Sequence, residues 1–200
     1  GAAHRLGAHT AETLHARGWN VVIHYRGRQK QARALADKLN QQRPESAVCY
    51  HADLTDMNQL RQLAEQACAH WGQLNALVNN ASVFYPNPTE DASEQDWDTI
   101  LGANLKAPFF LLQQCLPALK AASGSVVNMI DIYSEKPLKD HPLYCASKAG
   151  LAALTRSWAK DLAPDVRVNG VSPGAILWPE GESAVDAAHQ QAILDKTPLR

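Results

Sequence analysis

The chain has 200 residues, 46% of them hydrophobic, which is enough to bury the core of one α/β domain. Its formal net charge is −1 and its acidic and basic residues are interleaved, which argues against a nucleic-acid-binding surface. No apolar run reaches membrane-spanning length, and the four scattered cysteines include no C-x-x-C pair. This cysteine usage favours a reducing cytoplasm over a disulfide-built secreted protein.

Segments with the patterns of strands and of helices alternate along the chain. Short apolar strands are predicted at residues 20–26, 47–51, 74–81, 125–130 and 166–171. Helices are predicted at residues 7–18, 29–42, 56–71, 94–120, 144–162 and 183–195, the fourth of them bent near Pro108. Strands that alternate with helices predict a parallel sheet covered by helices on both faces.

The chain opens on a glycine-spaced turn before the first predicted helix. Gly1 and Gly7 flank this turn, with Arg5 and Leu6 between them. A turn of this kind before a helix N-terminus holds the pyrophosphate of a dinucleotide on backbone N–H groups. Because two glycines and a turn are common, the pattern by itself is weak support for a dinucleotide site.

The end of the first predicted strand indicates which dinucleotide is preferred. Folds that prefer NAD place Asp or Glu about 20 residues beyond the glycines, where it accepts from the ribose 2′-hydroxyl. Here that region reads His24-Tyr25-Arg26, without an acid. Arg26 and Arg5 can pair with a 2′-phosphate that a carboxylate would repel. Two solvated arginines are the simpler interpretation, but the missing acid favours NADPH.

Tyr144 and Lys148 stand at the start of the helix predicted at 144–162. Four residues apart, they share one helical face, which places an ammonium beside a phenol. The positive charge favours phenolate, so we expect a lowered pKa of Tyr144 and a role as general acid. A surface tyrosine with an unrelated lysine is the alternative, and it would be preferred if the pair stood alone.

These segments together resemble the short-chain dehydrogenase/reductase family over nearly the whole chain. The residues that carry the resemblance, in the family's order, are Gly1 and Gly7, Asp53-Leu54, Asn79-Asn80-Ala81, Asn104, Tyr144 with Lys148, and Pro173-Gly174. The resemblance implies one Rossmann-like, doubly wound domain over residues 1–200, a nicotinamide cofactor and a Tyr/Lys proton donor. It also implies that Asn104 steadies a water relay to Lys148. A homotetramer built through helices 94–120 and 144–162 is implied as well.

A narrower resemblance rests on two departures from the family's usual pattern. Arg5 stands where the family has glycine, and Asp131 stands where it has serine, thirteen residues before Tyr144. With the stretches 24–26 and 80–86, these departures look like the pteridine reductase branch, which reduces C=N bonds of pterins and dihydrofolate with NADPH. Asp131 is then expected to bind the pterin or help to protonate it. Phe84 is expected to stack on the ring, just past a strand end where ligands dock.

The expected site residues fall into three groups. The catalytic group is Tyr144, Lys148, Asp131 and Asn104. The cofactor group is Gly1, Arg5, Leu6, Gly7, His24, Tyr25, Arg26, Asp53, Leu54, Asn80, Ala81, Ser82, Met129, Tyr144, Lys148, Pro173 and Gly174. The substrate group is Ser82, Phe84, Asp131, Tyr144 and Trp178, the last as a second aromatic wall. No metal, nucleic acid or membrane partner is expected.

Two other functions remain open from the sequence. A carbonyl reductase acting on a ketone or 3-oxoacyl group would use Ser134 in place of the missing serine. Ser134 lies ten residues before Tyr144 rather than thirteen, which disfavours this interpretation. A non-catalytic NADPH-binding sensor would keep the fold without the chemistry. The intact set of Tyr144, Lys148 and Asn104 argues against a sensor.

The resemblance also bears on the extent of the sheet. In the family a first strand precedes the glycine turn and lies in the centre of the sheet, and a last strand follows the region around residue 200. We therefore expect a sheet that lacks its first and last strands, and a chain that is a fragment of a longer polypeptide. A rearranged sheet that closes the gap is the alternative.

Overall fold

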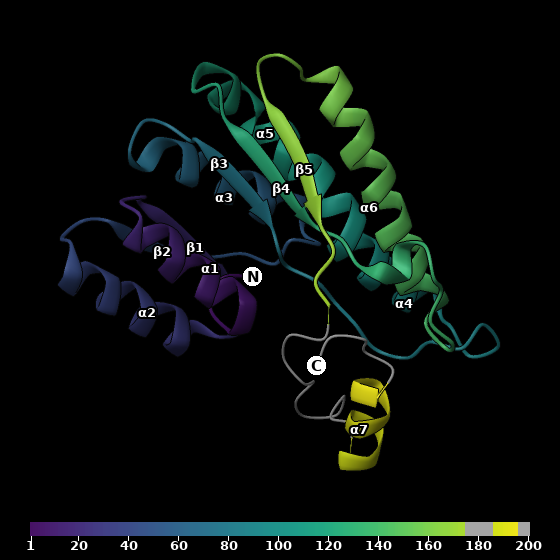
Figure 1. Cartoon of the computed structure of the whole chain (residues 1–200). Helices are drawn as coiled ribbons and strands as arrows, with labels where there is room; N and C mark the ends of the chain where they lie inside the picture. Colours follow the sequence, from purple (N-terminus) through teal and green to yellow (C-terminus); the bar gives the residue numbers. More distant parts are fainter. Residues whose placement is uncertain (175–185, 196–200) are drawn as a thin grey trace.

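The computed structural model describes residues 1–174 and 186–195 (Figure 1). Its strands are β1 (Val21–Tyr25), β2 (Ala47–His51), β3 (Ala76–Asn79), β4 (Ser125–Met129) and β5 (Arg167–Val171). Its helices are α1 (Arg5–Ala16), α2 (Gln29–Gln42), α3 (Met57–His70), α4 (Glu94–Leu101), α5 (Ala107–Ala121), α6 (Pro142–Asp161) and α7 (Ala187–Asp195), with a π-helical turn at Gly102–Lys106 and a 3₁₀ turn at Ile132–Ser134. This order confirms the predicted α/β architecture.

All the described strand pairs are parallel. β1 pairs with β2 from Val21 opposite Ala47, and β4 lies between β3 and β5 with Ser125 opposite both Ala76 and Arg167. Helices α1 and α2 pack on β1 and β2, α5 packs on β3, and α6 packs on β4 and β5 (Figure 1). The parallel strands therefore end at a common carboxyl edge, where ligands dock in folds of this kind.

The sheet is divided between β1 and β3. Across residues 1–174 and 186–195, no ladder joins these two strands, so the molecule has a two-stranded and a three-stranded sheet. A cleft of about 730 Å³ lies in the gap, lined by both strands, by α1 and by Cys115 of α5. The division falls where the family resemblance places the first strand.

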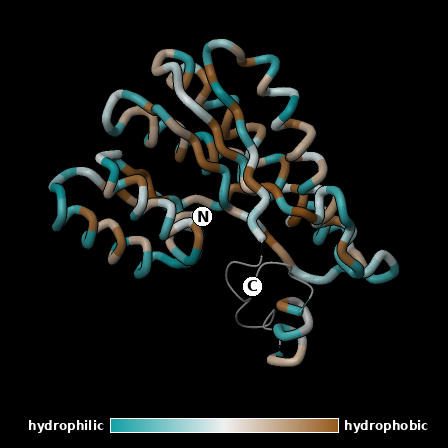
Figure 2. Tube along the Cα trace, viewed as in Figure 1, coloured by the Kyte–Doolittle hydropathy of each residue, from teal (hydrophilic) through white to brown (hydrophobic). Residues whose placement is uncertain are grey.

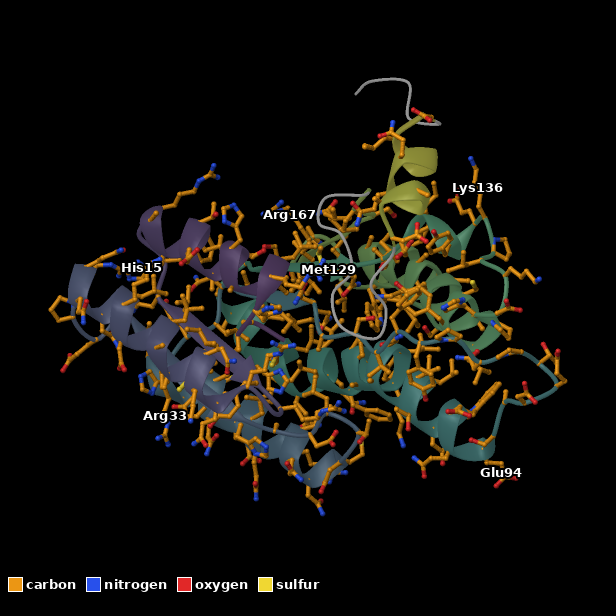
Figure 3. The ribbon with its side chains drawn as sticks, turned by 90° about the horizontal axis from the view of Figure 1, so that it is seen from below. His15, Arg33, Glu94, Met129, Lys136 and Arg167 are labelled. Carbon is orange, nitrogen blue, oxygen red and sulfur yellow. The ribbon has the colours of Figure 1, made fainter. Side chains whose placement is uncertain are left out.

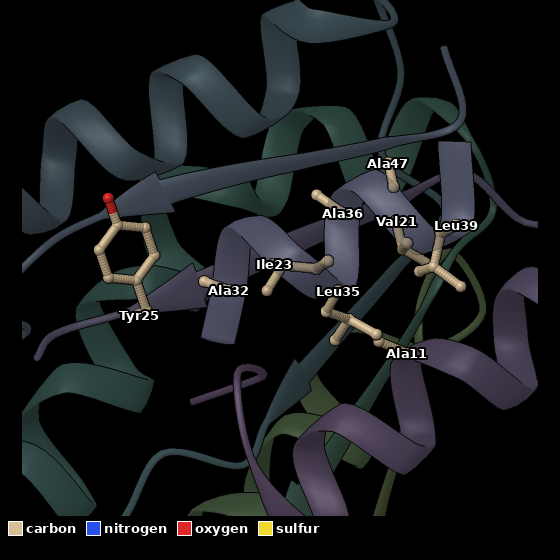
Figure 4. Close-up of a cluster of buried hydrophobic side chains, with 9 residues drawn as sticks. All are labelled: Ala11, Val21, Ile23, Tyr25, Ala32, Leu35, Ala36, Leu39 and Ala47. Atoms are coloured by element: carbon tan, nitrogen blue, oxygen red, sulfur yellow. The ribbon is translucent and has the colours of Figure 1, made fainter. Parts of the chain in front are cut away.

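Apolar side chains gather on both sides of this gap. One buried cluster joins α1, α2, β1 and β2 through the nine residues drawn in Figure 4, with Ile23 and Ala32 fully enclosed. A second cluster packs α5 and α6 against β3, β4 and β5. Figure 2 shows the hydrophobic colours concentrated along the strands and the hydrophilic colours on the outer turns of the helices. Among the described helices, none is both long and apolar enough to cross a bilayer.

The segment predicted as one helix at 94–120 is interrupted. α4 begins at a reciprocal capping box between Ser93 and Asp96, and α4 and α5 are joined by the π-helical turn at Gly102–Lys106. The irregularity lies next to Pro108, near where the bend was predicted. Pro108 is the second residue of α5, and Lys106 and Ala107 before it have helical backbone angles, so its missing N–H falls within a continuous helical segment directly after the π-helical turn.

The divided sheet leads to a prediction about association. The facing edges of β1 and β3 present backbone N–H and C=O groups outside any ladder, and such edges pair with other chains. The 200-residue chain by itself should therefore self-associate at micromolar concentration and unfold over a broad temperature range. Light scattering during size-exclusion chromatography, on serial dilutions, measures this. A monodisperse sample with one sharp transition would contradict it.

Candidate active site

The candidate site forms where the carboxyl ends of β3 and β4 meet the start of α6. Tyr144 and Lys148 lie one turn apart in α6, and both are buried, with 6% and 3% of their surface exposed. Pro142 at the first position of α6 fixes where this helix begins, because its backbone angle suits the first turn. The predicted juxtaposition of the phenol and the ammonium on one helical face is thereby present.

Asp131 follows β4 and contacts Tyr144 directly. The Tyr144 hydroxyl donates to Asp131 Oδ2 at 2.7 Å, and the Tyr133 backbone N–H donates to Asp131 Oδ1 at 3.1 Å. Asp131 thus caps the turn at Ile132–Ser134 with one oxygen and holds the phenol with the other. The two uses do not exclude each other, because each takes a different oxygen of the same carboxylate.

The expected direction of the Tyr144 pKa was wrong for this structure. Burial raises the pKa of Tyr144 above its ordinary value, and the hydrogen bond to the Asp131 carboxylate raises it further. Lys148 does not outweigh these effects on the neutral phenol: its Nζ donates to the Met129 carbonyl at 2.9 Å and lies 5.6 Å from the centre of the Tyr144 ring, a separation at which its charge still acts on a phenolate. Met129, labelled in Figure 3, is the last residue of β4 and is partly buried. Burial lowers the pKa of Lys148 to about 8.

Asn104 lies in the π-helical turn and is 1% exposed. Its side chain accepts from the Val83 N–H at 2.7 Å and donates to the Val83 carbonyl at 2.9 Å and to Ser147 Oγ at 3.2 Å. These bonds join three elements: the turn that carries Asn104, the loop after β3, and α6. Asn104 therefore fixes the loop that leads to Phe84.

Phe84 is placed beside Tyr144, as the sequence predicts. Their ring centres are 4.8 Å apart in a T-shaped arrangement, and Phe84 is 39% exposed. The ring of His141 stacks on Phe84 at 4.7 Å with an interplanar angle of 14°. Ser82 is exposed in the same loop. An accessible aromatic ring thus stands next to the hydroxyl–carboxylate pair.

The glycine turn forms a cradle without room for side chains. A Cβ on Gly7 would collide with the Gly1 carbonyl and lie 2.7 Å from Asn80 Nδ2, and one on Gly1 would lie 2.7 Å from Ala81 Cα. Asn80 Nδ2 also donates to the Gly1 carbonyl at 2.5 Å. The first turn of α1 carries no acid, so the positive end of the helix dipole is not neutralised. The cradle fits an anionic group such as a pyrophosphate.

A second cleft, of about 360 Å³, continues from this cradle past Arg26, Asp53, Leu54 and Ser82. Burial would raise the pKa of Asp53, but hydrogen bonds from Thr55 and the charge of Arg26 outweigh burial and keep this pKa below its ordinary value. Asp53 Oδ1 accepts from the Thr55 N–H at 2.9 Å and from the Thr55 hydroxyl at 2.7 Å.

The other expected cofactor residues differ in what their side chains can do. His24 Nε2 donates to the Ala52 carbonyl at 2.9 Å, and burial lowers the His24 pKa to about 4, so its ring is neutral at pH 7. Tyr25 is buried in the apolar cluster of Figure 4. Leu6 lies in the first turn of α1, and Pro173 and Gly174 follow β5. Trp178 lies outside the described residues.

A buried chain of polar side chains, which was not predicted from the sequence, lies beneath the site. Asn79 Nδ2 donates to Asn128 Oδ1 at 2.8 Å, and Asn128 Nδ2 donates to Thr155 Oγ1 at 2.9 Å. These side chains tie β3, β4 and α6 together where the catalytic pair is held. Asparagines within otherwise apolar strands were the available signal, because a buried amide requires a partner.

Comparisons with known proteins place the chain in a family. Residues 1–188 match the family described as short chain dehydrogenase, so the chain belongs to that family and is an oxidoreductase. Pteridine reductase 1 of Leishmania tarentolae is 35% identical over 219 residues, covering 90% of this chain and 76% of the relative. Trans-4-hydroxycyclohexanecarboxylate dehydrogenase of Sinomonas cyclohexanicum is 36% identical, covering 90% and 71%. The 3-oxoacyl-(acyl-carrier-protein) reductase FabG of Staphylococcus aureus is 29% identical, covering 100% and 81%.

Proposed function

We propose that this oxidoreductase reduces a C=N bond of a pterin or of dihydrofolate, with NADPH as the hydride donor. The observation that carries the proposal is the 2.7 Å hydrogen bond from the Tyr144 hydroxyl to the Asp131 carboxylate, beside the accessible ring of Phe84. A pterin offers ring N–H and amino donors that a carboxylate accepts, and a flat ring that stacks on an aromatic side chain. The similarity to a pteridine reductase agrees with this assignment.

The residues have distinct parts in the proposed reaction. NADPH, held in the cleft beside the glycine turn, would supply the hydride for the carbon of the C=N bond. The Tyr144 hydroxyl gives its proton to the neighbouring nitrogen, and its raised pKa keeps that proton on the phenol until then. Asp131 orients the phenol and accepts from the pterin, while the Lys148 ammonium stabilises the phenolate that forms. Gly1, Gly7 and the N-terminus of α1 would hold the pyrophosphate, and Ser82 would line the pterin site.

The carbonyl-reductase alternative is kept because FabG and a hydroxycyclohexanecarboxylate dehydrogenase are among the relatives. A ketone requires a hydroxyl donor near the developing alkoxide, and a carboxylate there is repulsive. Tyr144 bonds to Asp131, whereas Ser134 belongs to the adjoining 3₁₀ turn. NADPH oxidation measured with dihydrobiopterin and with a 3-oxobutyryl thioester separates the two reactions. Oxidation with neither substrate favours the sensor.

Cofactor choice is tested by replacing Arg26 with aspartate. A charge-assisted hydrogen bond contributes about 1.5–3 kcal/mol, so Arg26→Asp should weaken NADPH binding roughly 10- to 100-fold and leave NADH binding unchanged or improved. Arg5 supports the same proposal: its φ of 50° lies in the region that favours glycine, yet an arginine stands there. Fluorescence titration of both cofactors is the measurement.

Arg33→Asp is the matched control for this charge reversal. Arg33 is exposed on α2 (Figure 3), outside both clefts, so its replacement should leave the affinities for both cofactors unchanged. If the unmutated protein binds NADPH and NADH equally well, the proposed pairing of arginines with a 2′-phosphate is wrong.

We also propose that the protein is a cytoplasmic homotetramer assembled through α4, α5 and α6. Trp97 and Phe109 support this, because they are 55% and 39% exposed on α4 and α5. The ring of Phe109 lies 5.8 Å from the buried ring of Trp158 on α6, so the exposed Phe109 stands where α5 and α6 meet. The four cysteines are free thiols, as a reducing compartment requires.

A further inference from the structure

The loop that carries Phe84 is fastened at two places. We call residues 82–88 the Phe84 loop. Near its start, the side chain of Asn104 takes both the N–H and the C=O of Val83. Near its end, Asn87 is 3% exposed and makes hydrogen bonds of its own. Phe84 lies between these two attachments, so both determine where its ring stands.

Asn87 attaches the loop to the start of α6. Its backbone N–H donates to the Asp140 carbonyl at 2.7 Å, and its Oδ1 accepts from the Leu143 N–H at 3.3 Å. Its Nδ2 donates to the Tyr85 carbonyl at 3.1 Å within the loop. A single buried side chain thus joins the loop to a helix that begins 55 residues later in the sequence.

The backbone N–H of Leu143, in the first turn of α6, receives its hydrogen-bond acceptor from Asn87. The first N–H groups of a helix have no partner within it, and a side chain at the N-cap commonly accepts from one of them. In the described chain, His141 at the N-cap of α6 makes no such bond. Asn87 therefore supplies from the loop the acceptor that the N-cap residue does not.

The ring of His141 adds a second contact across the same junction. His141 stacks on Phe84 at 4.7 Å, and its Nδ1 donates to the Lys139 carbonyl at 2.7 Å. One face of the phenyl ring is thus covered by a residue that belongs to the start of α6. Tyr144 is three residues further along that helix, so the loop and the proton donor share one support.

We propose that Asn87 is a positioning residue, which holds the Phe84 loop against the start of α6 and thereby sets the separation between the Phe84 ring and the Tyr144 hydroxyl. This inference rests on the proposed function for the view that Phe84 is the substrate wall. A ring that moves away from Tyr144 no longer stacks on a substrate bound at the proton donor, so the substrate and its transition state both lose this contact. A contact that both states share raises KM when it is lost and leaves kcat nearly unchanged.

Steady-state kinetics of Asn87→Ala test the proposal. The kcat/KM for dihydrobiopterin should fall roughly 10- to 100-fold, mainly through a higher KM, while the Kd of NADPH stays within about twofold. Asn87→Asp keeps an acceptor for the Leu143 N–H and loses the donor to Tyr85, so its loss should be smaller. If Asn87→Ala fails to fold, Asn87→Ser carries the test, because its shorter side chain does not reach the Leu143 N–H; a KM equal to the wild-type value in a folded Asn87→Ser variant then overturns the proposal.

A double-mutant cycle with Phe84→Ala shows whether Asn87 acts through the ring. In the Phe84→Ala background, Asn87→Ala should change KM by less than about twofold, because no wall is left to position. Multiplicative effects of the two substitutions would overturn the proposal. A Phe84→Ala variant without effect on KM would overturn it as well.

Asn40→Ala is the control for stability. The Asn40 side chain likewise bonds to backbone groups, those of Ser46 and Ala47, but it lies in the last turn of α2 and joins this helix to the start of β2. The Asn40→Ala substitution should lower the melting temperature and leave KM unchanged. If Asn87→Ala also lowers the melting temperature and leaves KM unchanged, Asn87 has a structural role only. If the wild type reduces the 3-oxobutyryl thioester and not dihydrobiopterin, the proposed function fails, and the same cycle on the thioester decides the positioning role.

Discussion

Tyr144→Phe is expected to lower the turnover of dihydrobiopterin roughly 10²- to 10⁴-fold, the range over which a lost general acid reduces enzymatic rates. The substitution removes the hydroxyl that donates to Asp131 and leaves the ring that contacts Phe84. Substrate and NADPH affinities should therefore change little, and the loss should fall on kcat. Single-turnover NADPH oxidation at saturating substrate is the measurement. A loss confined to KM would show that Tyr144 binds the substrate without giving it a proton.

The pH profile adds a second test of the same residue. The raised pKa of Tyr144 keeps the phenol protonated, whereas the pKa of Lys148, lowered to about 8, means that the ammonium is lost as the pH rises through 8. The ammonium stabilises the forming phenolate, so wild-type kcat should be constant below pH 8 and decline above it. The residual activity of Tyr144→Phe should show no such decline, because no phenolate forms. A wild-type rate that is flat to pH 10 would remove Lys148 from this role.

Asp131→Asn is expected to lower dihydropterin turnover by about 10²- to 10⁴-fold and to leave NADPH binding nearly unchanged. The amide preserves the size of the side chain and can still accept from Tyr133, so the 3₁₀ turn should persist. It lacks the negative charge that accepts from the phenol and from the donors of a pterin. Asp131→Ser should not restore pterin reduction and could gain weak ketone reduction.

The control for Asp131→Asn is Asp165→Asn. Asp165 is exposed and lies 3.5 Å from Lys120, so loss of its charge should have little effect on stability or rate. Single-turnover oxidation of NADPH at saturating dihydrobiopterin compares both variants with the wild type. An unchanged rate in Asp131→Asn would make Asp131 a turn cap only and would place carbonyl reduction first.

Local sequence patterns predicted much of the fold. The helix at 29–42 and the strand at 47–51 match α2 and β2 at both ends, because hydrophobic periodicity and polar boundaries are local properties. The strand predicted at 74–81 is shorter in the structure, where β3 spans Ala76–Asn79. Its polar end residues bond elsewhere: the Asn80 side chain reaches back to Gly1, 79 residues away in sequence.

The positions of the site residues were easier to predict than their chemistry. Tyr144, Asp131 and Phe84 meet as expected, since each follows or begins an element at the same edge of the sheet. The pKa of Tyr144 has the opposite direction, because burial and a carboxylate thirteen residues away outweigh the lysine of its own helix. The role of Asn87 depends on a contact 56 residues away, which no local pattern contains.

The π-helical turn at Gly102–Lys106 determines the direction in which the Asn104 side chain leaves the helix. An α-helix turns by about 100° per residue, and a π-turn accommodates one residue more than the regular spiral. Deleting Ala103 would let α4 and α5 join into one regular helix, in which the apolar side chains of α5 could still be buried. Asn104 would then take the place of Ala103, so its amide, which now reaches Val83 and Ser147, would be turned by about 100° relative to α4. A perfectly regular helix in this segment would therefore no longer hold the Phe84 loop and α6 together through Asn104.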